Sequence, residues 1–239
     1  MWDNPRLLNG AASLLTGLAL ALLLAAGVQL ALRSSWLELR EVTVLGAPAH
    51  TEREQIERAL QAALAGANFL AVDIDAVRNG LERLPWVRRV ELRRVWPDRL
   101  EVSLEEHVAF ARWGAAELVN TYGEVFAAQS EESLPIFAGP PGAAAEVVRR
   151  YRKFAELLSP LADAPSRVTL TSRYAWQLRL QSGLHLEVGR DHPGETAERR
   201  LARFVAAYPQ TLGRMQRRHE YVDLRYSNGF ALRIPELDG

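Results

Sequence analysis

The first pattern along the chain is a long apolar segment near its N-terminus. Residues Leu7–Leu32 contain no charged side chain, and a membrane-spanning helix needs about 20 mostly apolar residues. The pattern predicts a transmembrane helix at 7–32, preceded by a short tail of residues 1–6. A cleaved secretory signal is the alternative, with Ala25–Gly27 as its cleavage site. The apolar core of such a signal ordinarily has only about 7–15 residues, so the length favours an uncleaved anchor.

Three small residues of this segment, Gly17, Ala21 and Ala25, lie four positions apart and share one helical face. Such spacing lets two membrane helices pack closely. In an Ala-rich segment the same spacing also arises by chance, so both interpretations stay open. The flanking charges, Arg6 before the segment and Arg33 after it, are too evenly balanced to orient the helix.

Residues 37–107 combine helix and strand periods in the order of a small α+β unit. Thr51 and Glu54 have the spacing of a capping box. The first predicted helix begins there and stops near Gly66; the second follows Asp73 or Asp75 and ends at Pro85. The predicted strands are 39–46, 86–96 and 99–105, the last two joined by a turn at Pro97-Asp98.

The pattern of residues 108–239 predicts a mostly antiparallel sheet with two helices. Pro135–Gly142 is expected to form a rigid loop, and Ser182-Gly183 and Asn228-Gly229 are expected to form tight turns. The predicted strands are 108–113, 117–120, 125–126, 167–172, 176–181, 184–189, 221–226 and 230–234, and the predicted helices are 144–158 and 195–212.

Composition narrows the function classes. The chain is 48% hydrophobic and 24% charged, with a formal net charge of zero, so it has enough apolar residues for folded cores and no global basic field for nucleic acid. It contains no cysteine. This excludes disulfides, cysteine-ligated zinc and thiol catalysis.

One segment, Trp86–Trp96, carries four arginines beside aromatic rings. It is either a surface for nucleic acid or acidic lipid or the solvated face of an amphipathic strand. Five carboxylates lie close to it in sequence and favour the solvated strand: Glu91, Asp98, Glu101, Glu105 and Glu106.

No catalytic constellation stands out. The histidines lack the i, i+4 spacing of a zinc protease. His185, Glu187 and His192 come nearest to a metal cluster, although surface alternation explains them equally well. Asp73 and Asp75 form an acid pair that helix capping explains better. With no metal or cofactor site predicted, an anchor followed by two folded units favours a scaffold.

Several segments of the first unit resemble the POTRA domain of the bacterial FtsQ/DivIB cell-division family, and further segments resemble the β domain of that family. The POTRA segments are Val42–Gly46, Asn68–Asp73, Leu84–Val87 and Trp96–Val102 with Glu106. The β-domain segments are Ala111–Trp113, Val119–Phe126, Leu134–Pro140, Arg200–Phe204 and Tyr221–Tyr226.

The resemblance implies a POTRA domain at 37–107 and an FtsQ-type β domain at 108–239. It implies a non-enzymatic divisome protein of the inner membrane and division septum, with a cytoplasmic N-terminus and periplasmic domains. Its implied partners are the single-pass division proteins FtsB and FtsL, through which it helps control septal peptidoglycan synthesis. No nucleic acid, cofactor or small-molecule substrate is implied. The six-residue tail departs from the family and puts cytoplasmic contacts through it in doubt.

In the family a partner segment adds to the last strand of the β domain. Here that strand is Phe230–Ile234, a predicted sheet edge with unpaired backbone groups. Phe230, Leu232 and Ile234 share one face, which either anchors partner side chains or faces the core. Arg225 is suited to a bidentate contact with a carboxylate. The predicted partner-binding residues are Arg225, Tyr226, Asn228, Gly229, Phe230, Ala231 and Leu232.

Two other function classes compete with this interpretation. A membrane-anchored periplasmic enzyme, such as one that processes peptidoglycan, requires convergent polar residues that the sequence does not display. A POTRA-type export or assembly factor is ordinarily joined to a C-terminal β-barrel, for which the sequence gives no pattern.

Overall fold

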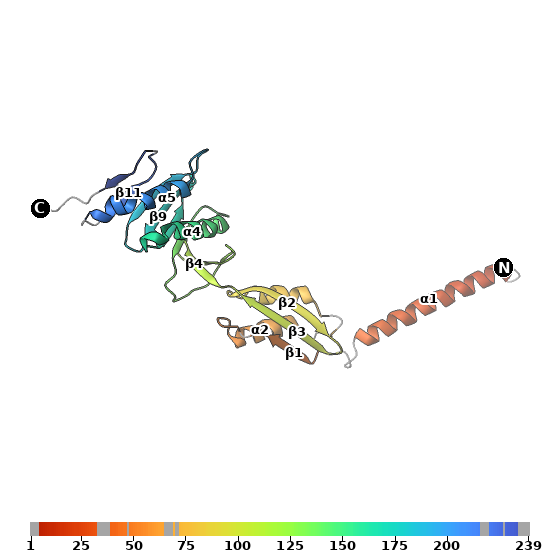
Figure 1. Ribbon diagram of the computed structural model, residues 1–239. Coiled ribbons are helices and arrows are strands. Elements are labelled where there is room, and N and C mark those ends of the chain that lie inside the picture. Colours follow the sequence, from red (N-terminus) through yellow and green to blue (C-terminus); the bar gives the residue numbers. More distant parts are fainter. Residues whose placement is uncertain are drawn as a thin grey trace. The chain divides into compact units, whose positions relative to one another are not determined.

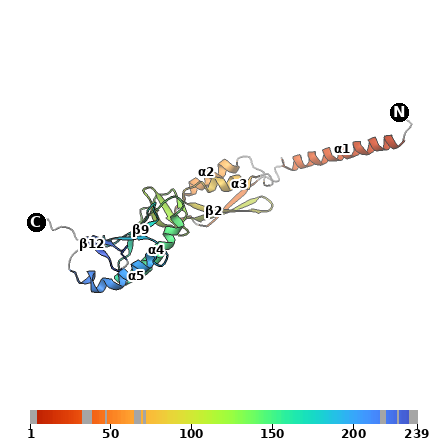
Figure 2. The ribbon, with the colours of Figure 1, turned by 90° about the horizontal axis from the view of Figure 1, so that it is seen from above.

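The computed structural model divides the chain into two compact units, Met1–Glu106 and His107–Gly239, drawn in Figures 1 and 2. The residues described are 5–32, 39–46, 48–64, 69, 72–215, 220–226 and 228–233.

Helix α1 (Pro5–Leu32) contains the apolar segment. Its 28 residues rise about 42 Å, more than the roughly 30 Å of a bilayer core. The leucines along Asn9–Gly27 are exposed, Leu23 to 71% for example. An apolar helix that no protein surface covers is suited to hydrocarbon. Helix α1 therefore has the length and composition of a single-pass membrane anchor.

The folded part of the first unit is a three-stranded sheet with two helices. Its strand order is β1 (Glu41–Leu45), β3 (Arg99–Glu106), β2 (Val87–Val95); β1 runs parallel to β3, and β2 antiparallel to it. Helices α2 (Arg53–Leu64) and α3 (Ile74–Leu81) lie together on one side of the sheet (Figure 2). The shared core comprises Ile56, Leu60, Val72, Val77, Leu81, Val87, Val90, Leu100 and Val102.

The carboxylate of Glu106 ties the end of β3 to the loop before α2. It accepts hydrogen bonds from the backbone N–H groups of Ala49 at 2.8 Å, His50 at 3.2 Å and Thr51 at 2.7 Å. The Thr51 hydroxyl also donates to this carboxylate. Helix α2 begins only at Arg53, so Thr51 does not directly precede the helix and the capping box predicted there is wrong. Sequence spacing could not reveal this, because the acceptor lies 55 positions away.

The predicted cap of α3 is confirmed. Asp73 precedes the helix, and its side chain accepts from the backbone N–H of Ala76 at 3.0 Å. Asp75 lies in the first turn and forms an ion pair with Arg78. The two carboxylates therefore have structural partners of their own.

The second unit is a nine-stranded, mostly antiparallel sheet covered by two helices. Its strand order is β12-β11-β10-β9-β8-β7-β4-β5-β6. The strands are β4 (Ala109–Trp113), β5 (Glu117–Asn120), β6 (Val125–Phe126), β7 (Ile136–Ala138), β8 (Pro165–Leu170), β9 (Ala175–Leu180), β10 (His185–Arg190), β11 (Tyr221–Asp223) and β12 (Ala231–Arg233). The α+β fold class predicted from the sequence is confirmed.

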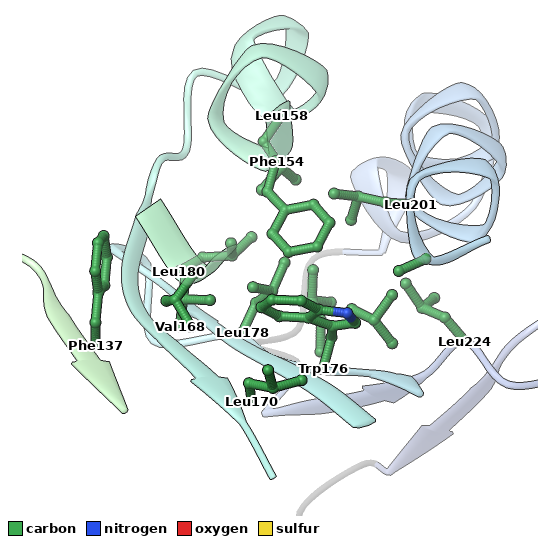
Figure 3. Packing of buried hydrophobic residues seen from close by; sticks show 14 of the residues in the cluster. Phe137, Phe154, Leu158, Val168, Leu170, Trp176, Leu178, Leu180, Leu201 and Leu224 are labelled. Carbon is green, nitrogen blue, oxygen red and sulfur yellow. The ribbon is translucent and has the colours of Figure 1, made fainter. Parts of the chain in front are cut away.

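Helices α4 (Ala144–Leu158) and α5 (Ala197–Ala207) supply one side of the core. Figure 3 shows Phe154 of α4 and Leu201 of α5 pointing toward the sheet residues Trp176 and Leu178. Phe154 meets Trp176 edge to face, with ring centroids 5.5 Å apart. Both helices therefore cover the same face and leave the other open.

Two predictions for this unit are wrong in part. The expected rigid loop at Pro135–Gly142 contains strand β7, which pairs in parallel with both β4 and β8. A strand of three residues gives no alternation signal, although Phe137 is fully buried. The helix predicted at 195–212 ends at Ala207, because Pro209 follows and the chain continues in short 3-10 turns.

We expect Glu106→Ala to lower the free energy of unfolding by about 1–3 kcal/mol, because three backbone donors lose a charged acceptor. Glu105→Ala is the matched control. Its carboxylate is 46% exposed and pairs with Arg88, whose side chain is 17% exposed, so this variant loses one ion pair where Glu106→Ala removes the acceptor of three backbone donors. Urea unfolding measures both variants, and equal losses would show that the Glu106 contacts add nothing specific.

Candidate functional site

Strand β12 ends the nine-stranded sheet. It pairs antiparallel with β11, with Tyr221 opposite Arg233, Val222 opposite Leu232 and Asp223 opposite Ala231. No strand of the described residues pairs with its other side. The predicted edge is therefore present. The hydrogen-bond pairing of β12 with β11 determines which backbone groups of β12 face outward.

Alternate residues of a strand point their N–H and C=O groups to opposite edges. The N–H of Leu224 donates to the carbonyl of Glu187 in β10. Val222, two residues earlier, therefore also points its backbone groups toward β10, and Asp223 points its groups toward β12. Ala231, opposite Asp223, faces β11 in return. The N–H and C=O of Leu232 consequently face away from the sheet.

The side chains of Phe230 and Leu232 do not face away. Both are partly buried against the core, and the Phe230 ring meets Phe204 of α5 edge to face at 5.7 Å. Of the two alternatives left by the sequence, core packing holds for these two residues. Ile234 lies outside the described residues. At its outer edge the strand therefore offers backbone groups, and the side chains of Phe230 and Leu232 are not available there.

The opposite, open face of the edge is polar. Ala231 and Arg233 are exposed there, beside Asp223 and Tyr221 of β11. Tyr221 stacks on His185 of β10 with ring centroids 5.3 Å apart. An added strand would therefore place alternate side chains against the core and against this polar face.

Arg225 and Asp223 form a fork at the end of β11. The Arg225 Nε lies 2.9 Å from Oδ1 of Asp223, and Nη2 lies 2.6 Å from Oδ2. These hydrogen bonds hold the pKa of Asp223 below its usual value and raise the pKa of Arg225. The Asp223 side chain is 9% exposed and that of Arg225 is 59% exposed. Asp223 occupies the edge of the guanidinium formed by Nε and Nη2. The end-on edge, which includes Nη1, stays available for a second carboxylate.

A glycine that sequence reasoning missed makes room for this fork. Gly189 in β10 has φ +84, and a Cβ there would lie 2.8 Å from Cγ of Arg225. Gly189 also falls where the register of β10 shifts. An isolated glycine inside an alternating strand is the signal that could have revealed this close approach.

A polar cavity of about 470 Å³ adjoins the fork. Arg173, Glu187 and Arg225 are among its lining residues. Arg200 of α5 also lines it, is 2% exposed, and donates from Nε to the Val188 carbonyl at 2.7 Å. Arg200 therefore fastens α5 to β10. Arg173, in contrast, is an exposed arginine that lines the same cavity as Arg225. The pattern of α5 does not distinguish Arg200 from exposed arginines of the same helix.

The remaining predicted residues lie in the loop between β11 and β12. Tyr226 is 58% exposed, and its carbonyl accepts from Nη2 of Arg203 at 2.8 Å. Asn228 is exposed and Gly229 is half-buried. The structure thus brings Arg225, Tyr226 and the β12 edge onto one end of the sheet, with α5 holding the loop.

Two of the three candidate metal residues, His185 and Glu187, have other partners. His185 stacks on Tyr221, and Glu187, which is buried, accepts from the side-chain amide of Gln177 at 2.8 Å. Within the part of the chain that the structure describes, no three metal-ligating side chains gather. Sheet packing accounts for the His185-x-Glu187 spacing.

The sheet of the first unit has two edge strands of its own, β1 and β2, and neither has a second partner strand among the described residues. A groove of about 970 Å³ runs between β1 and α2 and is lined by Val42, Val44, Ile56 and Leu60 among others. Its walls belong to the strand-helix packing of the POTRA-like unit. An assay of strand addition at β12 must therefore distinguish β12 from the other sheet edges.

We expect Gly189→Ala to displace Arg225 and to destabilise the fold more than Gly183→Ala. Gly183 also has a positive φ, +94, but a Cβ there meets nothing within 4 Å. Both variants carry the backbone strain of about 1–3 kcal/mol, and the clash adds about 1 kcal/mol at Gly189. Urea unfolding and the NMR shift of Arg225 Nε measure the two effects. An unchanged Arg225 signal in Gly189→Ala would contradict the close approach.

The Asp223–Arg225 pair predicts a dependence of stability on pH. Because the folded pKa of Asp223 is lowered, the pair stabilises the fold fully above the unfolded pKa of about 3.9 and loses that contribution as the pH falls through the folded pKa. We expect the unfolding free energy of Asp223→Asn and of Arg225→Gln to fall less steeply below about pH 4 than that of the wild type. Urea titrations at successive pH values give the slopes, and parallel slopes would refute the coupling.

Comparison with known proteins agrees with this architecture. Residues 111–225 match the family profile described as "Cell division protein FtsQ/DivIB, C-terminal", and residues 37–107 match "POTRA domain, FtsQ-type". The chain is 43% identical to Cell division protein FtsQ of Burkholderia pseudomallei over 98% of its own length and 94% of the relative.

Two further relatives carry the same name. Identity to the protein of Nitrosospira multiformis is 41%, over 98% of this chain and 99% of the relative. Identity to the protein of Escherichia coli is 34%, over 82% of this chain and 72% of the relative. These matches confirm the resemblance found in the sequence. With a candidate anchor, a POTRA domain and a β domain in the same order, the chain belongs to the FtsQ/DivIB family of cell division proteins.

Proposed function

We propose that this protein is a non-enzymatic scaffold of the division machinery that binds FtsB- and FtsL-type single-pass proteins, in part by strand addition at β12. In this proposal α1 spans the inner membrane at the septum, its N-terminus is cytoplasmic and both folded units are periplasmic. Through its partners the protein helps control septal peptidoglycan synthesis. Membership of the family and the membrane-spanning character of α1 support this arrangement.

The observation that carries the binding mode is the outward orientation of the Leu232 backbone. An unpaired donor and acceptor at a sheet edge match the backbone of an extended peptide. Arg225 and Tyr226 lie at the end of the same ladder, so a partner strand paired with β12 can extend toward them. The guanidinium, with its end-on edge available, and the adjacent Arg173 suit a partner segment that carries a carboxylate.

The test compares Leu232→Pro with Leu232→Val in the full chain, reconstituted in nanodiscs. Proline removes the outward N–H, and the missing donor leaves the β11 ladder intact because that N–H does not face β11. Valine keeps the N–H and most of the apolar side chain. Proline at Ala231 would instead remove a donor that faces β11, so it is the poorer probe.

We expect Leu232→Pro to weaken binding of the periplasmic segment of an FtsB-type partner about tenfold, since one backbone hydrogen bond at an interface is worth roughly 1.4 kcal/mol. Leu232→Val is expected to bind within about threefold of the wild type. Calorimetry measures the affinity, and circular dichroism verifies the fold. Undiminished binding by a folded Leu232→Pro variant would refute strand addition at β12.

Amide hydrogen exchange of the wild type tests the same idea without a substitution. Exchange at Leu232 should slow in the complex, while Ala231 and Arg233 are already protected by β11 in the free protein. Protection that instead appears at Val42 to Val44 of β1 would assign the partner to the groove of the first unit.

A further inference from the structure

The hairpin between β2 and β3 ends in an exposed aromatic residue. The hairpin tip, defined as Trp96, Pro97 and Asp98, joins the two strands, and Trp96 is 79% exposed. Burial of an aromatic side chain removes roughly 150–250 Å² of surface from water. A tryptophan that stays exposed at a turn does not contribute this burial to the stability of the fold. Sheet pairing explains Val87–Val95, and Trp86 stacks on His50, but neither contact gives Trp96 a role.

The arginines along this hairpin differ in whether a carboxylate lies opposite them. At the end away from the tip, Arg88 forms an ion pair with Glu105 at 2.7 Å. Near the tip the residue opposite Arg94 is Leu100, and Arg94 is exposed and donates from Nη2 to a backbone carbonyl, that of Val72.

The other charges around the tip largely cancel. Arg99 pairs with Glu41 at 3.1 Å, with both side chains more than half exposed, so the pair is weak. The charged residues around the tip are Arg40, Arg93, Arg94 and Arg99 against Glu41, Asp98 and Glu101. The tip is thus slightly basic, and its main feature is the indole ring.

The covalent chain fixes which end of the first unit lies nearer to the C-terminal end of α1. The backbone N–H groups of Arg40 and Glu41 both donate to the carbonyl of Asp98, at 3.0 and 3.4 Å. The tip therefore lies directly beside the residues at which the chain enters the first strand. Helix α1 ends at Leu32. The eight residues from there to Arg40 could span at most about 28 Å, the length of a fully extended chain. The Glu106 end of β3 lies about 23 Å farther along the strand.

A bilayer is the occupant that these observations favour. Tryptophan concentrates where membrane meets water, because its ring is apolar and its N–H is polar. Arginine beside it can bind lipid phosphates. A protein partner could cover the same ring, but the tether keeps the tip near the membrane surface whether or not a partner is bound.

We propose that the hairpin tip is a second membrane contact, in which Trp96 inserts into the interfacial layer of the bilayer spanned by α1 and the neighbouring arginines meet lipid phosphates. This contact is separate from partner binding at β12. It would hold the first domain against the membrane at the end where the chain emerges from it.

The experiment uses the full chain, whose lack of cysteine allows single spin labels. One label replaces Asp98 (Asp98→Cys), and the matched control replaces Glu52 (Glu52→Cys), which is exposed beside the Glu106 end of β3. Both proteins are reconstituted in phosphatidylcholine vesicles and in vesicles that also contain phosphatidylglycerol. Collisions with dissolved oxygen and with a water-soluble nickel chelate report the depth of each label.

We expect the label at position 98 to be shielded from nickel and accessible to oxygen, and the label at position 52 to have the opposite behaviour. Adding Trp96→Ala should abolish the shielding at 98, and Trp96→Tyr, which keeps an interfacial aromatic ring, should restore it. Circular dichroism and urea unfolding verify that each variant is folded. Shielding in both vesicle types indicates insertion driven by the ring, and shielding in the anionic vesicles alone indicates a dominant phosphate contact; both support the proposal.

Equal nickel accessibility at positions 98 and 52 in both vesicle types would overturn the proposal. So would shielding that survives Trp96→Ala in a folded protein. Dipolar broadening between labels at position 98 would overturn it as well, because a second copy of the chain would then cover the tip.

Discussion

A peptide group at the edge of a sheet has a donor and an acceptor that its own sheet cannot satisfy, and this constraint shapes the C-terminal unit. Seven of its nine strands are paired on both sides, and β12 and β6 form the two edges. At β12 the alternation of backbone groups leaves the outward-facing donor and acceptor on Leu232. Water satisfies these groups in the free protein, and a partner strand would satisfy them in a complex. The side chains that support the edge, among them Phe230 and Leu232, are partly buried against the core. Backbone and side chains of this strand therefore have different tasks.

The surroundings of the edge are held by polar contacts that converge from several elements. Asp223 fixes Arg225, Gly189 gives it room, and Arg203 holds the carbonyl of Tyr226. Each contact joins segments that are distant in sequence, except for the Asp223–Arg225 pair. The position of the exposed residues thus depends on α5 and β10 as much as on β11 and β12.

Sequence patterns predicted the elements with strong periodicity and missed those defined by tertiary contacts. Helix α4 was predicted with the bounds that the structure has, because fifteen residues sustain one apolar face. Strand β7 was missed because three residues are too few for a period, and its pairing with β4 and β8 is decided by the sheet. The candidate edge was predicted from its place in the chain. The orientation of the Leu232 backbone could not be, since it depends on the hydrogen bond from Leu224 to β10.

The order in which the strands follow one another along the chain has a consequence in time. Strand β11 lies parallel to β10, and the chain must pass through α5 before it can return to pair there. Strand β12 pairs with β11 and follows every other described strand in sequence. A nascent chain therefore cannot display this edge until the other described strands of the sheet and α5 have been synthesised. Exposure of the edge reports completion of the domain, so an unfinished copy has no such surface to offer.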